Sequence, residues 1–386
     1  MPVINRMAEL HDEITAWRHH YHANPELLYD VHETAADVAR KLHAFGCDEV
    51  VTGIGRTGVV GVIRGSRQGE RVIGLRADMD ALPIAEQTGK PYSSMNPGKM
   101  HACGHDGHTS MLLGAARYLA ETRNFAGTAV VIFQPAEEGG AGGKAMCDDG
   151  LMERFGISEV YAIHNLPGLP VGEFAICEGP IMAATDEFNI TLQGVGAHAA
   201  MPHQGRDSIV AGAQLVSALQ TIASRDADPL KSIVVSVTQF HAGSAHNIIP
   251  RTAEINGTVR TLDGEMRVLG EKRLREICDG VASTYGIEIT VDYRHGYPVT
   301  VNDSDATQKA IDVAKLVAGE ARVHPAFTPM MGGEDFAYML EERPGAYIFL
   351  GNGDSAKLHT PDYDFNDDAI PFGASYFAKL VETQLA

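Results

Sequence analysis

Apolar residues recur at helical spacing in three stretches of the first third of the chain, and short apolar runs separate these stretches. The helical periodicity covers residues 4–24, 31–46 and 109–122. The short runs, which are typical of strands buried on both faces, cover residues 59–63, 72–75 and 129–133. Because helices and buried strands alternate, this part of the chain predicts an α/β domain with a central mixed sheet between helices.

The pattern changes after Pro180, where polar and apolar residues begin to alternate along the expected strands. The predicted order is strand 187–194, helix 205–224, strand 231–240, strand 252–261, helix 265–285 and strand 287–294. This βαββαβ order is typical of a compact α+β unit, and the alternation indicates a sheet with one wet face. We therefore expect one discontinuous domain, residues 1–183 and 296–386, and an inserted domain, residues 184–295.

Composition and charge exclude several classes of partner. The chain has 386 residues, 44% of them apolar, and a formal net charge of -19 without a basic patch, which makes nucleic acid and anionic membranes poor partners. No apolar run approaches the roughly 18 residues that a membrane-spanning helix needs. The first residues lack the apolar stretch of a signal peptide. The five cysteines are scattered and odd in number, so they indicate a cytoplasmic protein without a disulfide framework.

The segment around Cys103-Gly104-His105 carries the most distinctive chemistry. A thiolate and an imidazole two residues apart resemble half of a metal site. Further donors follow apolar, strand-like runs: Glu137, Glu138, His164 and His359. Sites in α/β domains gather at the carboxyl ends of strands, and this set of sulfur, nitrogen and oxygen donors suits zinc or a neighbouring first-row metal. His101 and His108 remain alternatives to His105, and each donor alone could be an ordinary structural or solvated residue.

Seven motifs, spread in order over essentially the whole chain, carry a resemblance to a known family. They are His22–Leu27, Leu75–Pro83, Met100–Thr109, Phe133–Gly139, Gly196–Pro202, His246–Pro250 and Gly332–Phe336. The chain resembles the co-catalytic metallopeptidase and aminoacylase family. Within this family it is similar to the branch of hippurate hydrolase, N-acyl-L-amino-acid amidohydrolases and indole-acetyl-amino-acid hydrolases.

The resemblance implies a catalytic domain with two divalent metal ions per subunit, which could be Zn, Mn, Co or Ni, and an inserted lid domain that also forms a homodimer. The implied ligands are Cys103, His105, Glu138, His164 and His359. Two positions depart from the wider family. Cys103 stands where most members have a bridging aspartate, and Asp78-Met79-Asp80 stands where they have His-x-Asp. The resemblance implies that His105 replaces the missing imidazole, whereas Asp80 either orients a ligand at the catalytic site or is an ordinary turn aspartate.

The resemblance also assigns roles outside the ligand set. Glu137 matches the general base, and His198 matches a histidine that the lid of the partner subunit supplies. Asn247 and Arg260 match residues that bind the substrate carboxylate, although an arginine at the end of a strand often pairs with surface acids instead. Gly332 and Gly333 would let the backbone approach the substrate closely. The implied reaction is hydrolysis of a small N-acyl-L-amino acid to a carboxylic acid and a free amino acid.

Two other functions remain open at this point. One is a dipeptidase or carboxypeptidase on the same scaffold, and the other is a non-catalytic, ligand-binding dimer. The retention of Glu137 and of every implied ligand argues against the second. We also expect metal-free Cys103 to be partly thiolate and open to oxidants, because cations stabilise a thiolate.

Overall fold

The computed structural model describes residues 3–386, and the chain forms two compact units. Unit 1 consists of Met1–Ile181, Val301–Thr328 and Asp335–Ala386, and unit 2 consists of Met182–Thr300 and Pro329–Glu334. Within residues 3–386, no helix combines the length and the apolar character that a membrane crossing requires.

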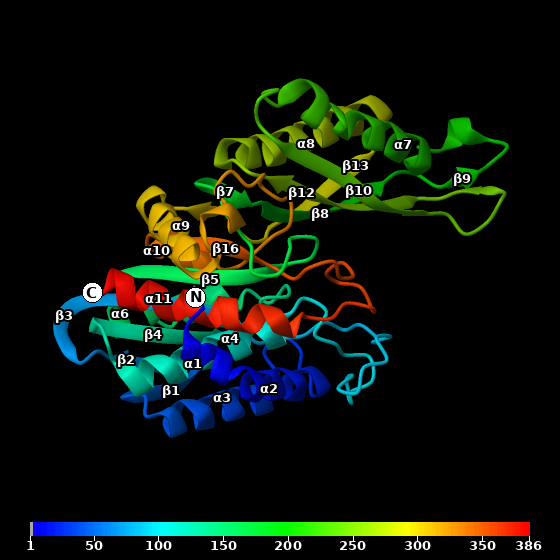
Figure 1. Ribbon diagram of the computed structural model, residues 1–386. Coiled ribbons are helices and arrows are strands. Elements are labelled where there is room, and N and C mark those ends of the chain that lie inside the picture. The colour runs from blue at the N-terminus through cyan, green and yellow to red at the C-terminus, as the bar shows by residue number, and fades with distance from the viewer. Residues whose placement is uncertain (1–2) are drawn as a thin grey trace. The chain divides into compact units, whose positions relative to one another are not determined.

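Unit 1 contains a large sheet among helices (Figure 1). Its helices are α1 (Asn5–Glu9), α2 (His11–Ala23), α3 (His32–Phe45), α4 (His105–Thr122), α5 (Gly142–Asp148), α6 (Leu151–Phe155), α9 (Ser304–Ala318), α10 (Ala337–Glu342) and α11 (Ile370–Gln384). Its main strands are β1 (Glu49–Ile54), β2 (Gly58–Arg64), β3 (Arg67–Asp78), β4 (Ala126–Gln134), β5 (Glu159–Leu166), β6 (Phe174–Ala175), β15 (Val323–His324) and β16 (Gly345–Gly351). A short ladder of β7 (Gly179–Met182) and β14 (Thr300–Asn302) lies where the chain passes between the units.

The strand order of the large sheet is β1-β2-β4-β3-β5-β16-β6-β15. Strands β4, β3, β5 and β16 run parallel to one another, whereas β1 and β2 pair in antiparallel fashion at one end and β6 is antiparallel to β16. The expected α/β class with a mixed central sheet is therefore confirmed. Four parallel strands that end at the same edge place the residues after them close together.

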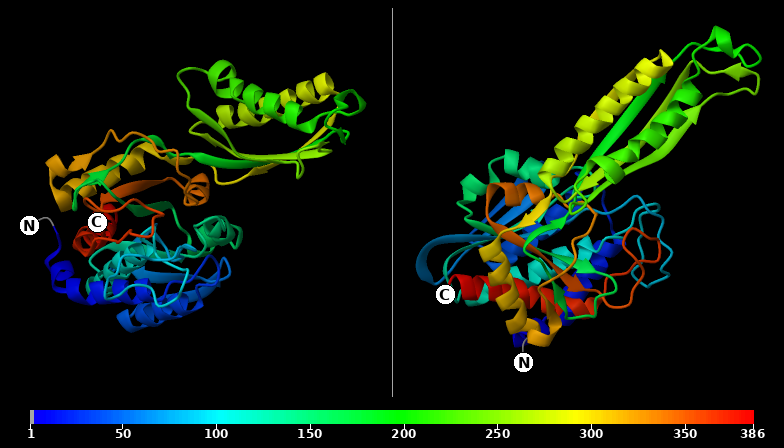
Figure 2. Two further views of the ribbon diagram at one scale, coloured as in Figure 1. Left: turned by 90° about the vertical axis from the view of Figure 1, so that its right-hand side faces the viewer. Right: turned by 90° about the horizontal axis from the view of Figure 1, so that it is seen from above.

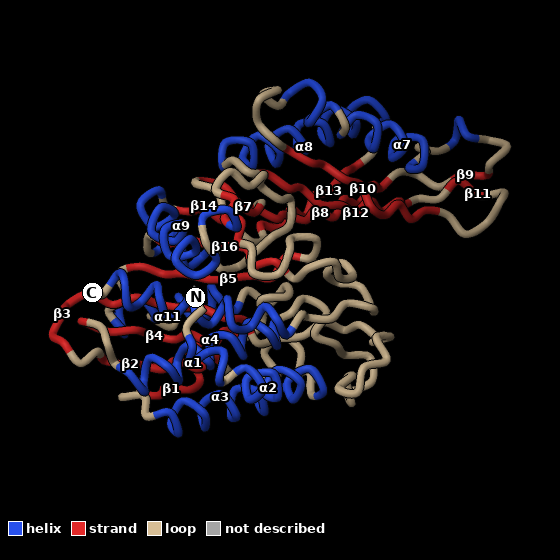
Figure 3. Tube along the Cα trace, viewed as in Figure 1, coloured by secondary structure: helices blue, strands red, loops and turns tan. Residues whose placement is uncertain are grey.

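Unit 2 is an antiparallel sheet with helices on one side (Figures 2 and 3). Its elements are β8 (Ala184–Gln193), β9 (Ala197–His198), α7 (Ser208–Leu219), β10 (Ile233–Ala242), β11 (Ile248–Ile249), β12 (Thr252–Thr261), α8 (Gly264–Tyr285) and β13 (Glu288–His295). Phe188 of β8, Leu215 of α7 and Leu274 of α8 share one buried core. The opposite face alternates with the core positions and is less buried, which confirms the predicted wet face.

Two helix starts in the sequence pattern are wrong by a few residues, and the caps explain one of them. The helix expected from residue 205 begins at Ser208, because the Asp207 side chain accepts hydrogen bonds from the backbone N–H groups of Ile209 and Val210 and caps the helix there. The helix expected from residue 109 begins at His105, so the Cys103–His105 motif forms the entry to α4.

Candidate metal centre

The candidate donors come together at one edge of the large sheet in unit 1. Asp80 follows the end of β3, and Glu137 and Glu138 follow the end of β4. His164 lies near the C-terminal end of β5. Because these strands are parallel neighbours, their carboxyl ends converge, as the sequence pattern predicted.

Cys103 lies in the turn that leads into α4, and Gly104 makes this turn possible. Gly104 has a φ of 89°, in the left-handed region, and a Cβ there would lie 2.3 Å from the Asn165 amide nitrogen and 2.6 Å from the Tyr363 hydroxyl. Only glycine therefore combines this backbone conformation with this close approach. The turn places Cys103 and His105 on the same buried side.

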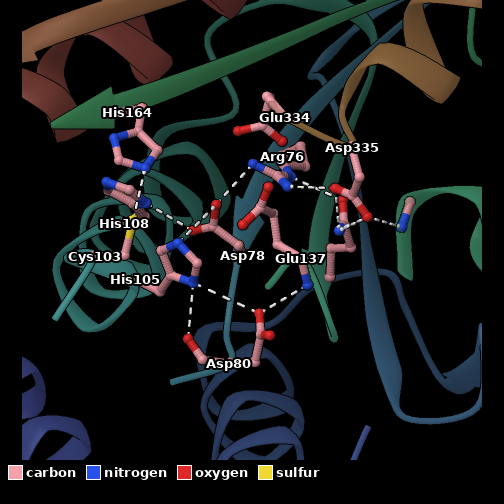
Figure 4. A network of polar contacts seen from close by, with 12 residues as sticks. Arg76, Asp78, Asp80, Cys103, His105, His108, Glu137, His164, Glu334 and Asp335 are labelled. Atoms are coloured by element: carbon pink, nitrogen blue, oxygen red, sulfur yellow. Dashed lines mark hydrogen bonds and ion pairs between the residues drawn. The ribbon is translucent and has the colours of Figure 1, made fainter. Parts of the chain in front are cut away.

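Two groups of potential ligands share Cys103, and Figure 4 shows the group that Cys103 forms with His105 and His164. One comprises Cys103, His105 and His164, and the other comprises Cys103, Glu138 and His359; within each group the ligand atoms lie within 4.8 Å of one another. The Cys103 sulfur lies 3.4 Å from Nε2 of His164, and Nε2 of His359 lies 3.3 Å from Oε1 of Glu138. The Cys103 sulfur therefore belongs to both groups and could serve as a ligand in either.

The hydrogen bonds of the two buried imidazoles leave Nε2 of each ring facing the centre. Nδ1 of His105 is 2.7 Å from the Asp80 carbonyl oxygen, and Nδ1 of His164 is 2.7 Å from the Asn165 carbonyl oxygen. A carbonyl oxygen can only accept, so each Nδ1 carries a proton, and Nε2 is the nitrogen of each ring that is left for a metal. Nε2 of His105 is buried and has no hydrogen-bond partner among residues 3–386.

The electrostatics around His105 favour a cation. Burial by itself lowers the pKa of His105, but the charges of Asp78 and Glu138 and the contact with Asp80 raise it to about 10. The site therefore stabilises a positive charge at this imidazole. A divalent metal would interact favourably with the same carboxylates, and it would give Nε2 of His105 a partner. The donor set and the unpartnered Nε2 fit a metal centre.

His101 and His108 are less suited than His105 to be the histidine ligand that accompanies Cys103. Nδ1 of His108 donates to Asp78 at 2.6 Å, and its Nε2 accepts the backbone N–H of Asn165 at 3.0 Å, so both nitrogens are engaged by protein. His101 belongs to none of the potential ligand groups found among residues 3–386. The geometry thus favours His105 as the partner of Cys103.

Asp80 holds the backbone of the adjacent glutamates rather than facing the centre with its side chain. One of its carboxylate oxygens accepts the N–H of Glu137 at 2.9 Å, and the other accepts the N–H of Glu138 at 3.1 Å. Its carbonyl oxygen accepts from His105. Asp80 therefore fixes three candidate site residues through hydrogen bonds, which makes it a positioning residue and more than a turn aspartate.

Two donor segments contain non-glycine residues in the left-handed region. Ala136, just before the glutamate pair, has a φ of 54°, and His359 has a φ of 61°. Such conformations are sparsely populated and persist only where surrounding contacts impose them. The N–H of His359 donates to the Ala102 carbonyl at 2.8 Å, so the His359 segment is tied to the turn that carries Cys103.

The expectation that metal-free Cys103 is a reactive thiolate is wrong. Cys103 is buried, and burial together with the charges of Glu138, Glu137 and Asp78 raises the pKa of its thiol well above the usual value. The sequence pattern suggested nearby cations, but the charges that act most on the thiol are those of three carboxylates, Glu138, Glu137 and Asp78. Without metal, the protonated thiol is poorly nucleophilic and shielded from solvent.

A buried ion-pair network supports the floor of the site (Figure 4). Arg76 donates to Asp78 at 2.8 Å and to Asp335 at 3.0 Å, and all three side chains are almost completely inaccessible to solvent. Gln134 and the N–H of Gly143 also donate to Asp335. The network links β3, β4, α5 and the segment before α10, and the sequence pattern did not predict it.

Two buried side chains of α2, Arg18 and His22, hold the segments beside the site. In Arg18, Nε lies 2.8 Å from Oδ1 of Asp367 and Nη1 lies 3.2 Å from Oδ1 of Asp364. In His22, Nδ1 lies 2.8 Å from Oδ2 of Asp106 and Nε2 lies 3.3 Å from Oε1 of Glu86. Burial by itself lowers the pKa of His22, but its hydrogen bonds to Asp106 and Glu86 raise it to about 9. His22 is thus a buried cation held between two carboxylates.

His22 should make stability depend on pH. A folded pKa of about 9, above the unfolded value of about 6.5, gives a contribution that is complete below pH 6.5 and is lost as the pH rises through 9. The Glu86 pKa is lowered from 4.5 to about 2, so its contribution to stability is complete above pH 4.5 and is lost as the pH falls through 2. We expect His22→Gln to destabilise the protein by about 1.5–3 kcal/mol at pH 6 and by clearly less at pH 9.5. Thermal melts of both proteins across this range test it, and a difference that does not change with pH would contradict it.

The remaining predicted site residues lie in unit 2. His198 is exposed on β9, where it pairs with Ile248 of β11, and Asn247 directly precedes β11. Arg260 lies near the end of β12, half-buried on the wet face of the sheet. A Cβ on Gly333 would lie 2.3 Å from the Thr185 side chain, and one on Gly332 would lie 2.9 Å from Met182. Packing within unit 2 thus accounts for Gly333, whereas the flexible end of Met182 could move away from a side chain at position 332.

Comparisons with known proteins find similarity to enzymes that hydrolyse peptide or related amide bonds. Residues 74–383 match the model of peptidase family M20/M25/M40. The chain is 45% identical over 380 residues to a hippurate hydrolase of Campylobacter jejuni, with 98% of each chain covered. It is 38% identical to a thermostable carboxypeptidase of Saccharolobus solfataricus, covering 97% of this chain and 96% of the relative. It also superimposes, with a TM-score of 0.85 and 34% identity, on a dinuclear metal-binding peptidase of Bacillus subtilis, covering 98% and 99% of the two chains.

Proposed function

The chain belongs to peptidase family M20/M25/M40, and from this premise we propose that it is a metal-dependent amidohydrolase that cleaves N-acyl-L-amino acids such as hippurate. The products are a carboxylic acid and a free amino acid. The observation that carries the proposal is the pair of donor groups that share Cys103, with Glu137 directly beside the donor Glu138.

The residues that would hold two divalent cations are Cys103, His105, Glu138, His164 and His359. Cys103 is common to both donor groups, so its thiolate would contribute to holding the cations of either group. Bound cations would supply Lewis-acid activation of a water molecule and of the scissile carbonyl group. The mixed sulfur, nitrogen and oxygen donors admit Zn, Mn, Co or Ni.

Glu137 is the proposed general base. Its backbone is fixed by Asp80, and its side chain is almost buried at 7% exposure, next to the donor groups. In the proposed mechanism the Glu137 carboxylate takes a proton from the attacking water and delivers it to the nitrogen of the departing amino acid. Asp80 holds Glu137 and Glu138 through separate oxygens, which lets adjacent glutamates serve different roles.

The dimensions of unit 2 support a site completed by a second subunit. Thr252 and Arg260 bound a span of eight residues on β12, about 26 Å at the usual rise of a strand. His198 and Asn247 lie beyond the Thr252 end of that strand, because the β8–β12 ladder continues into the β9–β11 ladder (Figure 1). One small substrate cannot touch both ends, so in our proposal His198 and Asn247 serve the site of the partner subunit.

Mixing two inactive variants tests this arrangement. Glu137→Gln and His198→Ala should each have little activity alone, whereas subunit exchange in the mixture should restore about a quarter of the wild-type activity. Half of the exchanged dimers would then hold one intact site, built from the Glu137 of one chain and the His198 of the other. A mixture with no more activity than the separate variants would contradict a shared site.

A substrate panel tests the reaction itself. Metal-reconstituted protein should hydrolyse hippurate and other N-acyl-L-amino acids in preference to a dipeptide such as Ala-Phe. Cleavage of the dipeptide alone would favour the carboxypeptidase alternative, which the carboxypeptidase relative keeps open. Binding of N-acyl amino acids without turnover would favour the non-catalytic alternative.

We place the protein in the cytoplasm, because all five cysteines, each within the described residues, are free thiols.

A further inference from the structure

We propose that Asn165 is a positioning residue that fixes the spacing of the metal-binding segments. The inference rests on the proposed two-metal function, and it concerns a residue that belongs to neither donor group. Asn165 follows His164 on β5 and is fully buried. Each of its four polar groups forms a hydrogen bond, and together these bonds reach every segment that carries a ligand except the glutamate loop.

The contacts of Asn165 connect four parts of unit 1. Its Nδ2 donates to the Cys103 carbonyl oxygen at 2.6 Å, and its Oδ1 accepts from the Tyr363 hydroxyl at 2.7 Å. Its backbone N–H donates to Nε2 of His108 at 3.0 Å, and its carbonyl oxygen accepts from Nδ1 of His164 at 2.7 Å. The turn with Cys103, helix α4, strand β5 and the segment after His359 therefore meet at one side chain.

Only an asparagine satisfies these partners. The Cys103 carbonyl oxygen can only accept, so the amide must present Nδ2 to it and Oδ1 to Tyr363. Burial raises the pKa of Tyr363 well above its usual value, which keeps the hydroxyl protonated and able to donate. An aspartate of the same shape would set a carboxylate oxygen against the Cys103 carbonyl. Gly104 leaves the room for this contact, since a Cβ there would overlap both Asn165 and Tyr363.

Asn165 helps to set the distance between two ligand atoms, Sγ of Cys103 and Nε2 of His164. Its side chain holds the backbone of Cys103, and its carbonyl oxygen holds the ring of His164, so both members of the 3.4 Å pair between Sγ and Nε2 are bonded to the same residue. Partners behind metal ligands typically contribute 10- to 100-fold to metal affinity. We therefore expect Asn165 to set affinity and ligand geometry without touching substrate.

Asn165→Asp tests the inference, with Asn302→Asp as a matched control. Asn302 is also buried in unit 1, and its Nδ2 donates to the Cys177 and Tyr347 carbonyl oxygens, but none of its hydrogen bonds reaches a ligand-bearing residue. The readouts are Co²⁺ affinity by chelator competition, the sulfur-to-cobalt charge-transfer absorption, and the melting temperature. The absorption is assigned to Cys103 by its loss in Cys103→Ser.

We expect Asn165→Asp to lower Co²⁺ affinity 10- to 100-fold and to shift or weaken the absorption band. Tyr363→Phe, which keeps the ring and removes only the hydroxyl, should change both in the same direction but less, and it remains informative if Asn165→Asp does not fold. Asn302→Asp should lower the melting temperature and leave both metal readouts unchanged.

Wild-type affinity and spectrum in Asn165→Asp and Tyr363→Phe, or equal changes in Asn302→Asp, would overturn the inference. The metal readouts do not depend on turnover, so they stand even if no substrate in the panel is cleaved. A wild-type protein that takes up no Co²⁺ would overturn the metal-dependent function and this inference together.

Discussion

Glu137→Gln is expected to reduce kcat for N-acyl amino acid hydrolysis by about 10²- to 10⁴-fold while metal content and KM stay near wild type. The substitution keeps the size of the side chain and removes its ability to accept a proton. The hydrogen bond that positions residue 137 runs from its backbone N–H to Asp80, so it survives the change. The loss should therefore appear in the chemical step and not in folding or metal uptake.

Glu138→Gln is the matched control, because the same change is made one residue away. Glu138 lies in the donor group with Cys103 and His359, so its variant should lose metal as well as activity. Metal content per subunit and steady-state kinetics on the same preparations separate the two roles. If Glu137→Gln kept wild-type kcat, or if it lost metal as Glu138→Gln does, the assignment of Glu137 as general base would be wrong.

Arg76→Met is expected to destabilise unit 1 by about 3–5 kcal/mol, the largest effect on stability that we expect from one substitution. Asp78 and Asp335 are buried carboxylates that face the Arg76 guanidinium. Removal of that cation takes one positive charge away from both buried carboxylates in a region that excludes water. A loss of this size is a large share of the 5–15 kcal/mol that stabilises a typical domain.

Arg71→Met on the same strand is the control. Arg71 pairs with Glu159 at 2.7 Å, but its side chain is 47% exposed, and surface ion pairs contribute about 0–1 kcal/mol. Trp17, the single tryptophan of the chain, lies in α2, so its fluorescence during urea unfolding reports on unit 1. A destabilisation of Arg76→Met no larger than that of Arg71→Met would mean that the buried network contributes little.

The fold was predictable where the pattern is local. The alternation in β8 and β12 and the apolar runs of β2, β3 and β4 identified these strands, because each depends on which face of a strand is buried. The edge strand β1 did not stand out, since its residues are mostly exposed and carry little periodic signal. Helix α4 begins four residues before its expected start, at His105, after the left-handed Gly104.

The residues of the candidate site were predictable from the sequence, but the hydrogen bonds and ion pairs between them were not. The motifs indicated the donor residues, and the structure brings all five into two groups that share Cys103. Nothing local separated His105 from His101 and His108, because the choice depends on partners from other strands. The network of Arg76, Asp78 and Asp335 was missed for the same reason. Asn165 is the neighbour of the candidate ligand His164 in the sequence, but its hydrogen bonds reach positions more than 50 residues away.

The sequence by itself determined the kinds of element, their order, the family and the chemical types of donor, because periodicity and motif spacing are properties of neighbouring residues. Only the tertiary structure decided which nitrogen of each histidine faces the centre and that Asp80 holds the backbone of two glutamates. It also decided that burial and three nearby carboxylates keep the Cys103 thiol protonated. These properties depend on distances of a few ångströms between segments far apart in the chain, and packing alone sets those distances.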